Sequence, residues 1–332
     1  MINILKLYII DTLACPPYTG FFISYGLYMN RSFHLRCTGA LLVSAMLAMA
    51  ATAAAAAAEK QYTITAPDGV QLAVQESGNP AGPAIIFIHG LLGSRLNWEQ
   101  QTTASRLQRY RLITYDMRGH GLSGKPEDAE SYRDGRRYAD DLAAVIKASH
   151  ATRPVLVGWS LGGVVMSNYL SAYSDKDIGA LVYVDGVIEL NAQLITAQPE
   201  VYAGMASSDL KTHLDAVRTF VSLCFNTQPD QATFERLLAN AAMASWPMTK
   251  ATPTMTVESV QSLPKVQVPL LALYGGKDTL VQTMPTLARL KALAPRARTI
   301  VYDNAGHAPF LEEAQRFNRD LATFVDAVPE AR

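Results

Sequence analysis

The chain has 332 residues, of which 49% are hydrophobic and 17% are charged, a balance that suits a packed core and excludes an intrinsically disordered chain. Its 29 basic and 29 acidic side chains give a formal net charge of zero. Because no basic excess exists to neutralise phosphates, the composition argues against nucleic acid as a partner.

The N-terminal part of the chain is typical of a targeting segment rather than of a folded domain. Residues 29–58 contain two arginines (Arg31 and Arg36), then an uncharged apolar stretch (41–50) and an alanine run that ends at Ala58. This order predicts a signal peptide, and a periplasmic or secreted protein. A bilayer span needs about 20 apolar residues, so an uncleaved anchor is the weaker alternative. After cleavage we expect no stable membrane association.

Residues 1–28 precede this signal and leave two interpretations open. Either Met29 is the true start and the preceding stretch is not translated, or residues 1–28 form an apolar extension that contacts membrane. Cleavage near Ala58 leaves about 270 residues, the size of one α/β domain with an insertion. Residues 59–332 keep a single cysteine, Cys224, so we expect no internal disulfide.

Strand and helix patterns alternate through residues 59–332. The segments 61–65 and 70–76 flank a Pro-Asp-Gly turn and predict a hairpin. Continuous apolar runs, as in strands buried on both faces, lie at 84–89, 111–116, 154–159, 180–185, 269–274 and 298–302. Helix-like apolar spacing is found at 138–149, 161–172, 286–294 and 310–328. The alternation predicts a mostly parallel sheet with helices on both faces.

The stretch from about 187 to 263 interrupts this alternation. It has helical spacing but no convincing buried strand, so we expect a helical cap inserted between two strands. The candidates for lining a substrate pocket, most of which are expected only to pack the helices of the insertion, are Met205, Phe220, Leu223, Phe225, Met243, Trp246 and Met248.

A nucleophile is predicted at Ser160, within the pentapeptide Gly158-Trp159-Ser160-Leu161-Gly162. A Gly-x-Ser-x-Gly sequence that follows a strand and precedes a helix indicates a nucleophile elbow, where larger side chains at the glycines would collide with the backbone. The alternative is a Gly-rich turn whose serine only caps a helix. Trp159, next to the serine, is expected to line the pocket.

The base that activates this serine is predicted at His307. Only His307 follows the last predicted strand, where the chain order serine, acid, histidine places the base. His89 ends a strand and His120 lies in a glycine turn, where structural roles are expected, and no motif surrounds His150 or His213.

The acid that orients the base is predicted at Asp278, in a Gly-Gly-Lys-Asp sequence that directly follows a strand. The alternative is Asp185, which ends the strand before the insertion but could equally cap a helix. An oxyanion hole requires donors fixed in advance, and we expect the backbone N–H groups of Leu161 and Leu91. The Leu91 side chain is expected to line the pocket.

Taken together, five motifs resemble the α/β-hydrolase superfamily: His89-Gly90, the segment 116–123, Gly-Trp-Ser-Leu-Gly-Gly, Gly-Gly-Lys-Asp and Gly-His-Ala-Pro-Phe. The likeness covers roughly 61–328 and is nearest to carboxylesterases, cofactor-free haloperoxidase-like perhydrolases and methyl esterases. It implies an eight-stranded sheet with a helical cap and a triad of Ser160, Asp278 and His307. It also implies that Arg118 and His120 are architectural, and serine at position 160 disfavours the dehalogenase and epoxide-hydrolase branches.

These features predict a serine hydrolase that cleaves small to medium, mainly apolar carboxylic esters through an acyl-enzyme. The alternatives are a perhydrolase, or a lactone or C–C bond hydrolase, that uses the same triad, and a non-catalytic ligand-binding fold. The sequence contains no His-x-x-x-His, Cys-x-x-Cys or Walker motif, so neither a metal nor a nucleotide cofactor is predicted.

Overall fold

The computed structural model describes residues 59–329. The predictions for residues 1–28 and for the signal peptide at 29–58 therefore lie outside the described residues. Within residues 59–329, no helix has both the length and the apolar content that a bilayer crossing requires.

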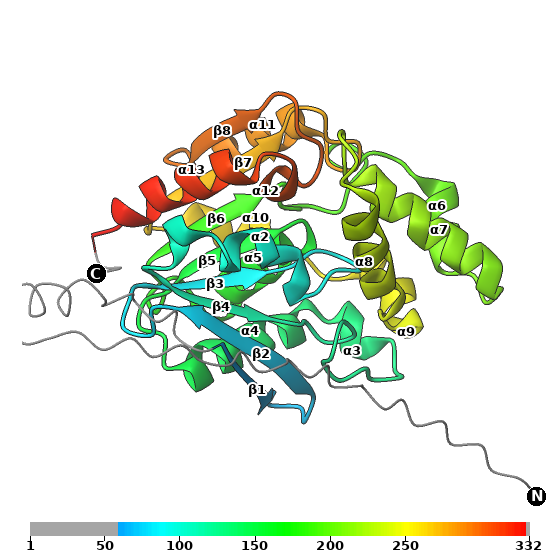
Figure 1. Cartoon of the computed structure of the whole chain (residues 1–332), viewed down its shortest axis with the longest axis horizontal. Coiled ribbons are helices and arrows are strands. Elements are labelled where there is room, and N and C mark those ends of the chain that lie inside the picture. Colours follow the sequence, from blue (N-terminus) through cyan, green and yellow to red (C-terminus); the bar gives the residue numbers. More distant parts are fainter. Residues whose placement is uncertain (1–58, 330–332) are drawn as a thin grey trace, which may run out of the picture. The chain divides into compact units, whose positions relative to one another are not determined.

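The core of the fold is one eight-stranded sheet in the order β1-β2-β4-β3-β5-β6-β7-β8 (Figure 1). The pairs β1–β2 and β2–β4 are antiparallel, and all other neighbouring strands are parallel. Strands β3, β5, β6 and β7 are buried along their full length, because helices cover both of their faces. The strands are β1 Lys60–Thr65, β2 Gln71–Gly78, β3 Ala84–Ile88, β4 Arg111–Tyr115, β5 Val155–Trp159, β6 Ala180–Val184, β7 Leu270–Gly275 and β8 Arg298–Tyr302.

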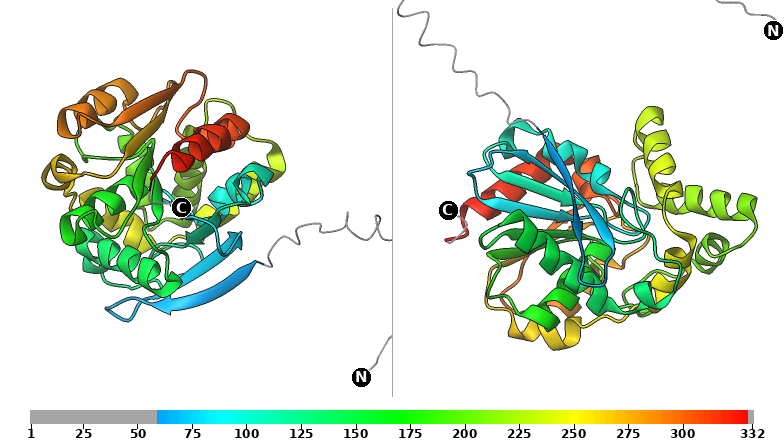
Figure 2. Two further views of the ribbon diagram at one scale, coloured as in Figure 1. Left: turned by 90° about the vertical axis from the view of Figure 1, so that its left-hand side faces the viewer. Right: turned by 90° about the horizontal axis from the view of Figure 1, so that it is seen from below.

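Helices lie on both faces of the sheet (Figure 2). Helices α4, α5 and α10 pack together on one face, and α2, α12 and α13 pack together on the other. The predicted helix at 310–328 is interrupted at Glu313 (φ −121°, ψ 44°), which separates α12 from α13. The helices outside the insertion are α2 Glu99–Thr102, α3 Glu130–Arg133, α4 Gly135–Ser149, α5 Leu161–Tyr173, α11 Thr283–Leu293, α12 Pro309–Glu312 and α13 Ala314–Asp326, with short 3₁₀ turns at Arg95–Trp98 and Ser105–Leu107.

The insertion between β6 and β7 is helical, and we call residues 187–263 the cap. Its helices α6 to α9 gather at one end of the sheet (Figure 1), whereas α10 returns to pack on α5. The predicted fold class, a mostly parallel eight-stranded sheet with flanking helices and a helical insertion, is confirmed. The helices of the cap are α6 Pro199–Met205, α7 Leu210–Leu223, α8 Gln231–Ala242, α9 Trp246–Ala251 and α10 Ser259–Ser262, with a 3₁₀ turn at Thr252–Thr254 and another, Leu263–Lys265, at its end.

Candidate active site

Ser160 occupies a strained turn between β5 and α5. Its backbone has φ 53° and ψ −113°, a conformation that non-glycine residues rarely adopt and that is found mainly at functional sites. Its N–H donates to the Val184 carbonyl (3.0 Å), and its carbonyl accepts from the N–H groups of Gly163 and Val187 (both 2.9 Å). Three backbone hydrogen bonds therefore hold the turn in place.

Two glycines make this turn sterically possible. A Cβ added at Gly158 would lie 2.6 Å from the Gly162 carbonyl oxygen, and one added at Gly162 would lie 2.5 Å from the Ile88 carbonyl oxygen. Both distances are much shorter than a van der Waals contact. The atoms that would be struck belong to the backbone, which cannot easily move away. The glycines of the Gly-x-Ser-x-Gly sequence thus have the steric role that the sequence predicts.

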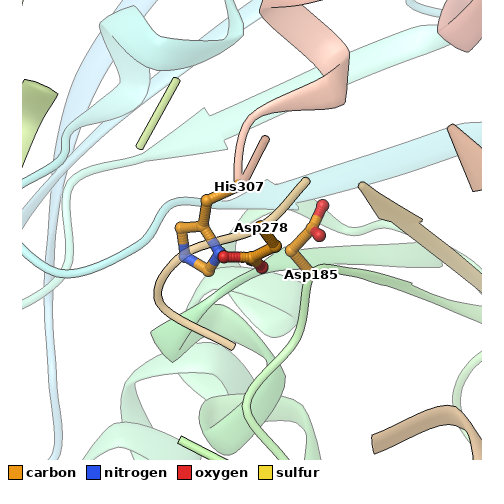
Figure 3. Close-up of side chains that lie close together, drawn as sticks. All are labelled: Asp185, Asp278 and His307. Carbon is orange, nitrogen blue, oxygen red and sulfur yellow. Dashed lines mark hydrogen bonds and ion pairs between the residues drawn. The ribbon is translucent and has the colours of Figure 1, made fainter. Parts of the chain in front are cut away.

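His307 and Asp278 form a hydrogen-bonded pair (Figure 3). The Asp278 Oδ2 lies 2.7 Å from the His307 Nδ1, and both side chains are buried. The other oxygen of Asp278 accepts the backbone N–H groups of Leu280 (2.7 Å) and Val281 (3.0 Å). Of the two carboxylates that the sequence offers as partners of His307, the hydrogen bond goes to Asp278 and not to Asp185.

Asp185 nevertheless lies close to this pair (Figure 3). Single oxygen or nitrogen atoms of Asp185, Asp278 and His307 all lie within 4.8 Å of one another, a donor set that a divalent cation can accept. However, three N–H groups already occupy three of the four lone pairs of the Asp278 carboxylate. The hydrogen bonds of Asp278 are therefore those expected of the acid in an acid–base pair.

Trp159 has a different position from the one that the sequence predicts. It is not among the residues that line the cavity at Ser160, which corrects the expectation that its ring forms the pocket. Its indole N–H instead donates to the His307 carbonyl (2.7 Å), and its ring contacts those of His307 and Phe310. Trp159 therefore contacts both the backbone and the ring of His307 and supports the loop that carries it.

Ser160 and His307 line one cavity of about 380 Å³. No Asp, Glu, Lys or Arg is among the described residues that line it, and the predicted lining residue Leu91 is present. Of the seven cap candidates, only Phe220 reaches this cavity. The sequence did not indicate the remaining apolar lining, which comes mostly from irregular segments: Leu161, Val187, Leu190, Ile195, Pro199, Tyr202, Pro253, Leu280 and Val281.

The predicted oxyanion donors border the same space. Leu91 and Leu161 both line the cavity beside Ser160. A Cβ added at Gly90 would lie 3.0 Å from the Ser160 Cβ, so the loop after β3 passes close to the nucleophile. Among the described residues, the Ser160 hydroxyl makes no hydrogen bond, and in unliganded sites such catalytic contacts often form only with substrate.

The other histidines near these motifs have structural roles. The Nδ1 of His89 contacts the Gly90 carbonyl (2.8 Å) and its Nε2 accepts from the Met117 N–H (2.9 Å), while burial lowers the pKa of His89 to about 4. Burial likewise lowers the pKa of His120 to about 3. Arg118 is fully buried and forms ion pairs with Asp141 (2.7 Å) and Asp68 (2.8 Å). These contacts are architectural, as the resemblance implies.

Glu312 ties the histidine loop to the cap. Its Oε1 accepts the backbone N–H groups of Gly306 (2.7 Å) and Asn226 (3.3 Å), and its Oε2 accepts that of Thr227 (2.7 Å). The loop between α7 and α8 is therefore bonded, through one carboxylate, to the residue that precedes His307.

A comparison with protein families matches residues 83–314 to the model described as alpha/beta hydrolase fold. Among solved structures, a proposed aryl esterase from Burkholderia cenocepacia is 64% identical, with a TM-score of 0.81 over 81% of this chain and 99% of that chain. An esterase from Rhodococcus sp. ECU1013 is 27% identical, with a TM-score of 0.74 over 81% of this chain and 99% of that chain.

The name of one curated relative gives two activities. The bifunctional esterase/perhydrolase of Acinetobacter calcoaceticus is 26% identical over 280 residues, which are 79% of this chain and 98% of the relative. The likeness therefore extends over almost the whole length of each of these proteins.

Proposed function

The chain belongs to the alpha/beta hydrolase fold family, and on that premise we propose that it is a serine hydrolase that cleaves carboxylic esters. The observation that carries the proposal is that a serine in a strained elbow and a histidine line one cavity, and that the histidine is bonded to a buried carboxylate. Ester hydrolysis agrees with the names of the 64% and 27% identical relatives.

In the proposed mechanism, the Ser160 Oγ attacks the ester carbonyl carbon while the Nε2 of His307 takes the hydroxyl proton. The tetrahedral oxyanion accepts hydrogen bonds from the N–H groups of Leu91 and Leu161. His307 gives the proton to the departing alkoxide, which leaves as an alcohol, and the acyl group remains on Ser160 as an acyl-enzyme. Water, deprotonated by His307, then releases the acid and restores the serine. Asp278 holds the Nδ1–H and stabilises the imidazolium.

The cavity supports a substrate class of uncharged, mainly apolar esters. Its lining among the described residues includes no ionisable carboxylate, ammonium or guanidinium group, so a charged acyl chain would lose its hydration without gaining a partner. A volume of about 380 Å³ is at the low end of the range for small-molecule sites. We therefore expect small to medium esters.

The proposal is tested with a panel of p-nitrophenyl esters of increasing acyl length, extended by lactones and amides. The protein is expected to hydrolyse the short and medium esters and to react with a fluorophosphonate probe, which labels activated serines. A protein that neither turns over any ester nor reacts with the probe would be a non-catalytic member of the fold.

Perhydrolysis is a second candidate, favoured by the name of the 26% identical esterase/perhydrolase. In that reaction hydrogen peroxide takes the place of water at the acyl-enzyme, and the products are a peracid and free serine. Bromide oxidation that requires both peroxide and a carboxylic acid or ester would separate this activity from plain hydrolysis.

Phe220 is expected to limit the length of the acyl chain. It is the predicted cap candidate that lines the cavity, and Phe220→Ala would add space for further methylenes. We expect the ratio of kcat/KM for octanoyl to butyryl esters to rise about tenfold. Both rates are measured on the same enzyme sample, so their ratio does not depend on the fraction of the protein that is folded. Phe225→Ala, which shortens a buried phenylalanine of the cap outside this cavity, should leave the ratio unchanged; equal shifts in both variants would contradict the assignment.

For localisation we propose export, on the strength of the signal-like segment at 29–58. In a Gram-negative host, the protein is expected in the periplasm or medium with an N-terminus near residue 59. Replacing Arg31 and Arg36 together by glutamate should retain it in the cytoplasm. Cell fractionation and N-terminal sequencing provide the measurement, and an uncleaved cytoplasmic product would refute the proposal.

A further inference from the structure

A second buried carboxyl group, which the proposed mechanism does not use, lies behind the acid–base pair. Asp185 directly follows β6 and is fully buried. Its backbone N–H donates to the Leu273 carbonyl (2.9 Å), and its Oδ1 accepts the Gly275 N–H (2.7 Å). Asp185 therefore joins the carboxyl ends of β6 and β7, next to the loop that carries Asp278 (Figure 3).

The two carboxyl groups differ in the number of donors that they accept. Asp278 receives three N–H groups, from Leu280, Val281 and His307. Asp185 receives one, and its Oδ2 is buried with no donor among the described residues. An ionised Asp185 would thus leave an oxygen without a hydrogen bond to the described residues in a fully buried position, which is costly.

Proximity adds to this difference. Atoms of Asp185 and Asp278 lie within the same 4.8 Å cluster, and repulsion between two buried carboxylates this close disfavours the state in which both are charged. A proton shared between them resides on the group with fewer donors. On Asp185 that proton has one free position, the Oδ2, because the Oδ1 already accepts a hydrogen bond.

We propose that Asp185 is a positioning residue, protonated at Oδ2, that donates a hydrogen bond to the carboxylate of Asp278. The pair then carries one negative charge, which stays on the carboxylate that contacts His307. This inference rests on the proposed function, since it concerns the acid that orients the base. Burial, followed by the charge of Asp278, raises the pKa of Asp185 well above its ordinary value, in agreement with a protonated group.

Of the other ionisable groups around Asp185, one disfavours its ionisation and two are neutral. The Glu312 carboxylate disfavours a further negative charge at Asp185. Tyr274, whose hydroxyl donates to the Gly186 carbonyl, and Cys224 are both neutral, because burial raises the pKa of each side chain. His307 is turned toward Asp278 through Nδ1.

The decisive variant is Asp185→Asn. An amide reproduces a protonated carboxyl group, because its oxygen can accept the Gly275 N–H while its NH₂ donates to Asp278. Asparagine also tolerates the left-handed backbone of this position (φ 42°). We expect unchanged kcat and KM, and an acid limb of the kcat/KM profile with the same midpoint as in the wild type.

An ionised Asp185 would give a different result. Its charge would stabilise the protonated imidazole in the wild type, so the amide variant would move the acid limb to lower pH by roughly one unit. That shift, or a large loss of kcat in Asp185→Asn, would overturn the proposal.

Asp185→Gly tests the hydrogen bond itself, and glycine adopts a positive φ without strain. Loss of the donor to Asp278 is expected to lower kcat by about 10- to 100-fold with little change in KM, as for other supporting groups of catalytic residues. Retention of wild-type kcat in this variant would show that Asp185 only fills space, and would also overturn the proposal.

Infrared spectroscopy provides a readout that is independent of turnover. The wild type is expected to show the C=O band of a buried protonated carboxyl group near neutral pH, and Asp185→Asn is expected to lack it. The wild-type ester assay is performed first. If the wild type cleaves no ester, the proposed function fails; if it does and the band is absent, only the assignment of the proton fails.

Discussion

Replacing Ser160 by alanine is expected to lower kcat for short p-nitrophenyl esters by about four to six orders of magnitude, because the acyl-enzyme can no longer form. The remaining rate would reflect water attack in a site that still binds and polarises the ester. Because the Ser160 hydroxyl makes no hydrogen bond among the described residues, the variant should keep its thermal unfolding temperature. Initial rates and thermal denaturation provide the measurements.

Fluorophosphonate labelling supplies the matched control for this variant. The wild type and Ser171→Ala, which changes an exposed serine of α5, are expected to react with the probe, whereas Ser160→Ala is not. Near-wild-type turnover by Ser160→Ala, or labelling that persists in it, would show that another group is the nucleophile.

The second large effect is expected for Asp278→Asn, with a fall in kcat of about 10³- to 10⁴-fold. The carboxylate accepts a hydrogen bond from the His307 Nδ1 at 2.7 Å and offsets the charge that this ring gains during attack. An amide has no charge to offer, and its NH₂ group can hold the imidazole in the tautomer that cannot accept the serine proton. Steady-state kinetics with a butyryl ester measures the change.

Asp303→Asn is the matched control, because Asp303 is an exposed aspartate on the loop that leads to His307. It should retain wild-type kinetics. If Asp278→Asn retained a tenth or more of the wild-type kcat, the orienting charge would have to come from Asp185, the alternative that the sequence left open.

The layered fold could be read from the sequence because its signals are local. A strand covered on both faces must be apolar throughout, and Ala84–Ile88 and Val155–Trp159 lie within a residue of the predicted runs. The elbow at Ser160 could be predicted for the same reason, because the tight turn requires glycine two residues before and two residues after the serine. Both the buried strands and the elbow place requirements on residues that are neighbours in the chain, so a sequence pattern is enough to predict them.

The residues that line the cavity could not be predicted from local sequence patterns. Leu190 and Ile195 lie on an irregular segment, and Ile195 is positioned by a bridge to Val281, a residue far along the chain. Trp159 shares the elbow with Ser160, yet the direction of its ring depends on the carbonyl of His307. One local signal was available: an aspartate that accepts the N–H groups two and three residues later forms a common turn, which would have placed Leu280 and Val281 beside Asp278.

The proton assigned to Asp185 depends even less on local sequence. Its only signal in the chain is an aspartate at the end of a strand, which suits a helix cap, a catalytic acid or a buried neutral group. The neutral state follows from the different numbers of donors around two carboxyl groups that the fold brings together from the ends of β6 and β7.

The bonding of Glu312 has a consequence for how substrates enter. Lifting the hairpin of α7 and α8 away from the sheet would break the hydrogen bonds of Asn226 and Thr227 to the same carboxylate that holds Gly306. An enlarged entrance on that side would therefore loosen the segment that carries the imidazole. The position of this part of the cap and the position of His307 are therefore linked through the Glu312 carboxylate, so a change that widens the cap on this side is expected to slow proton transfer as well.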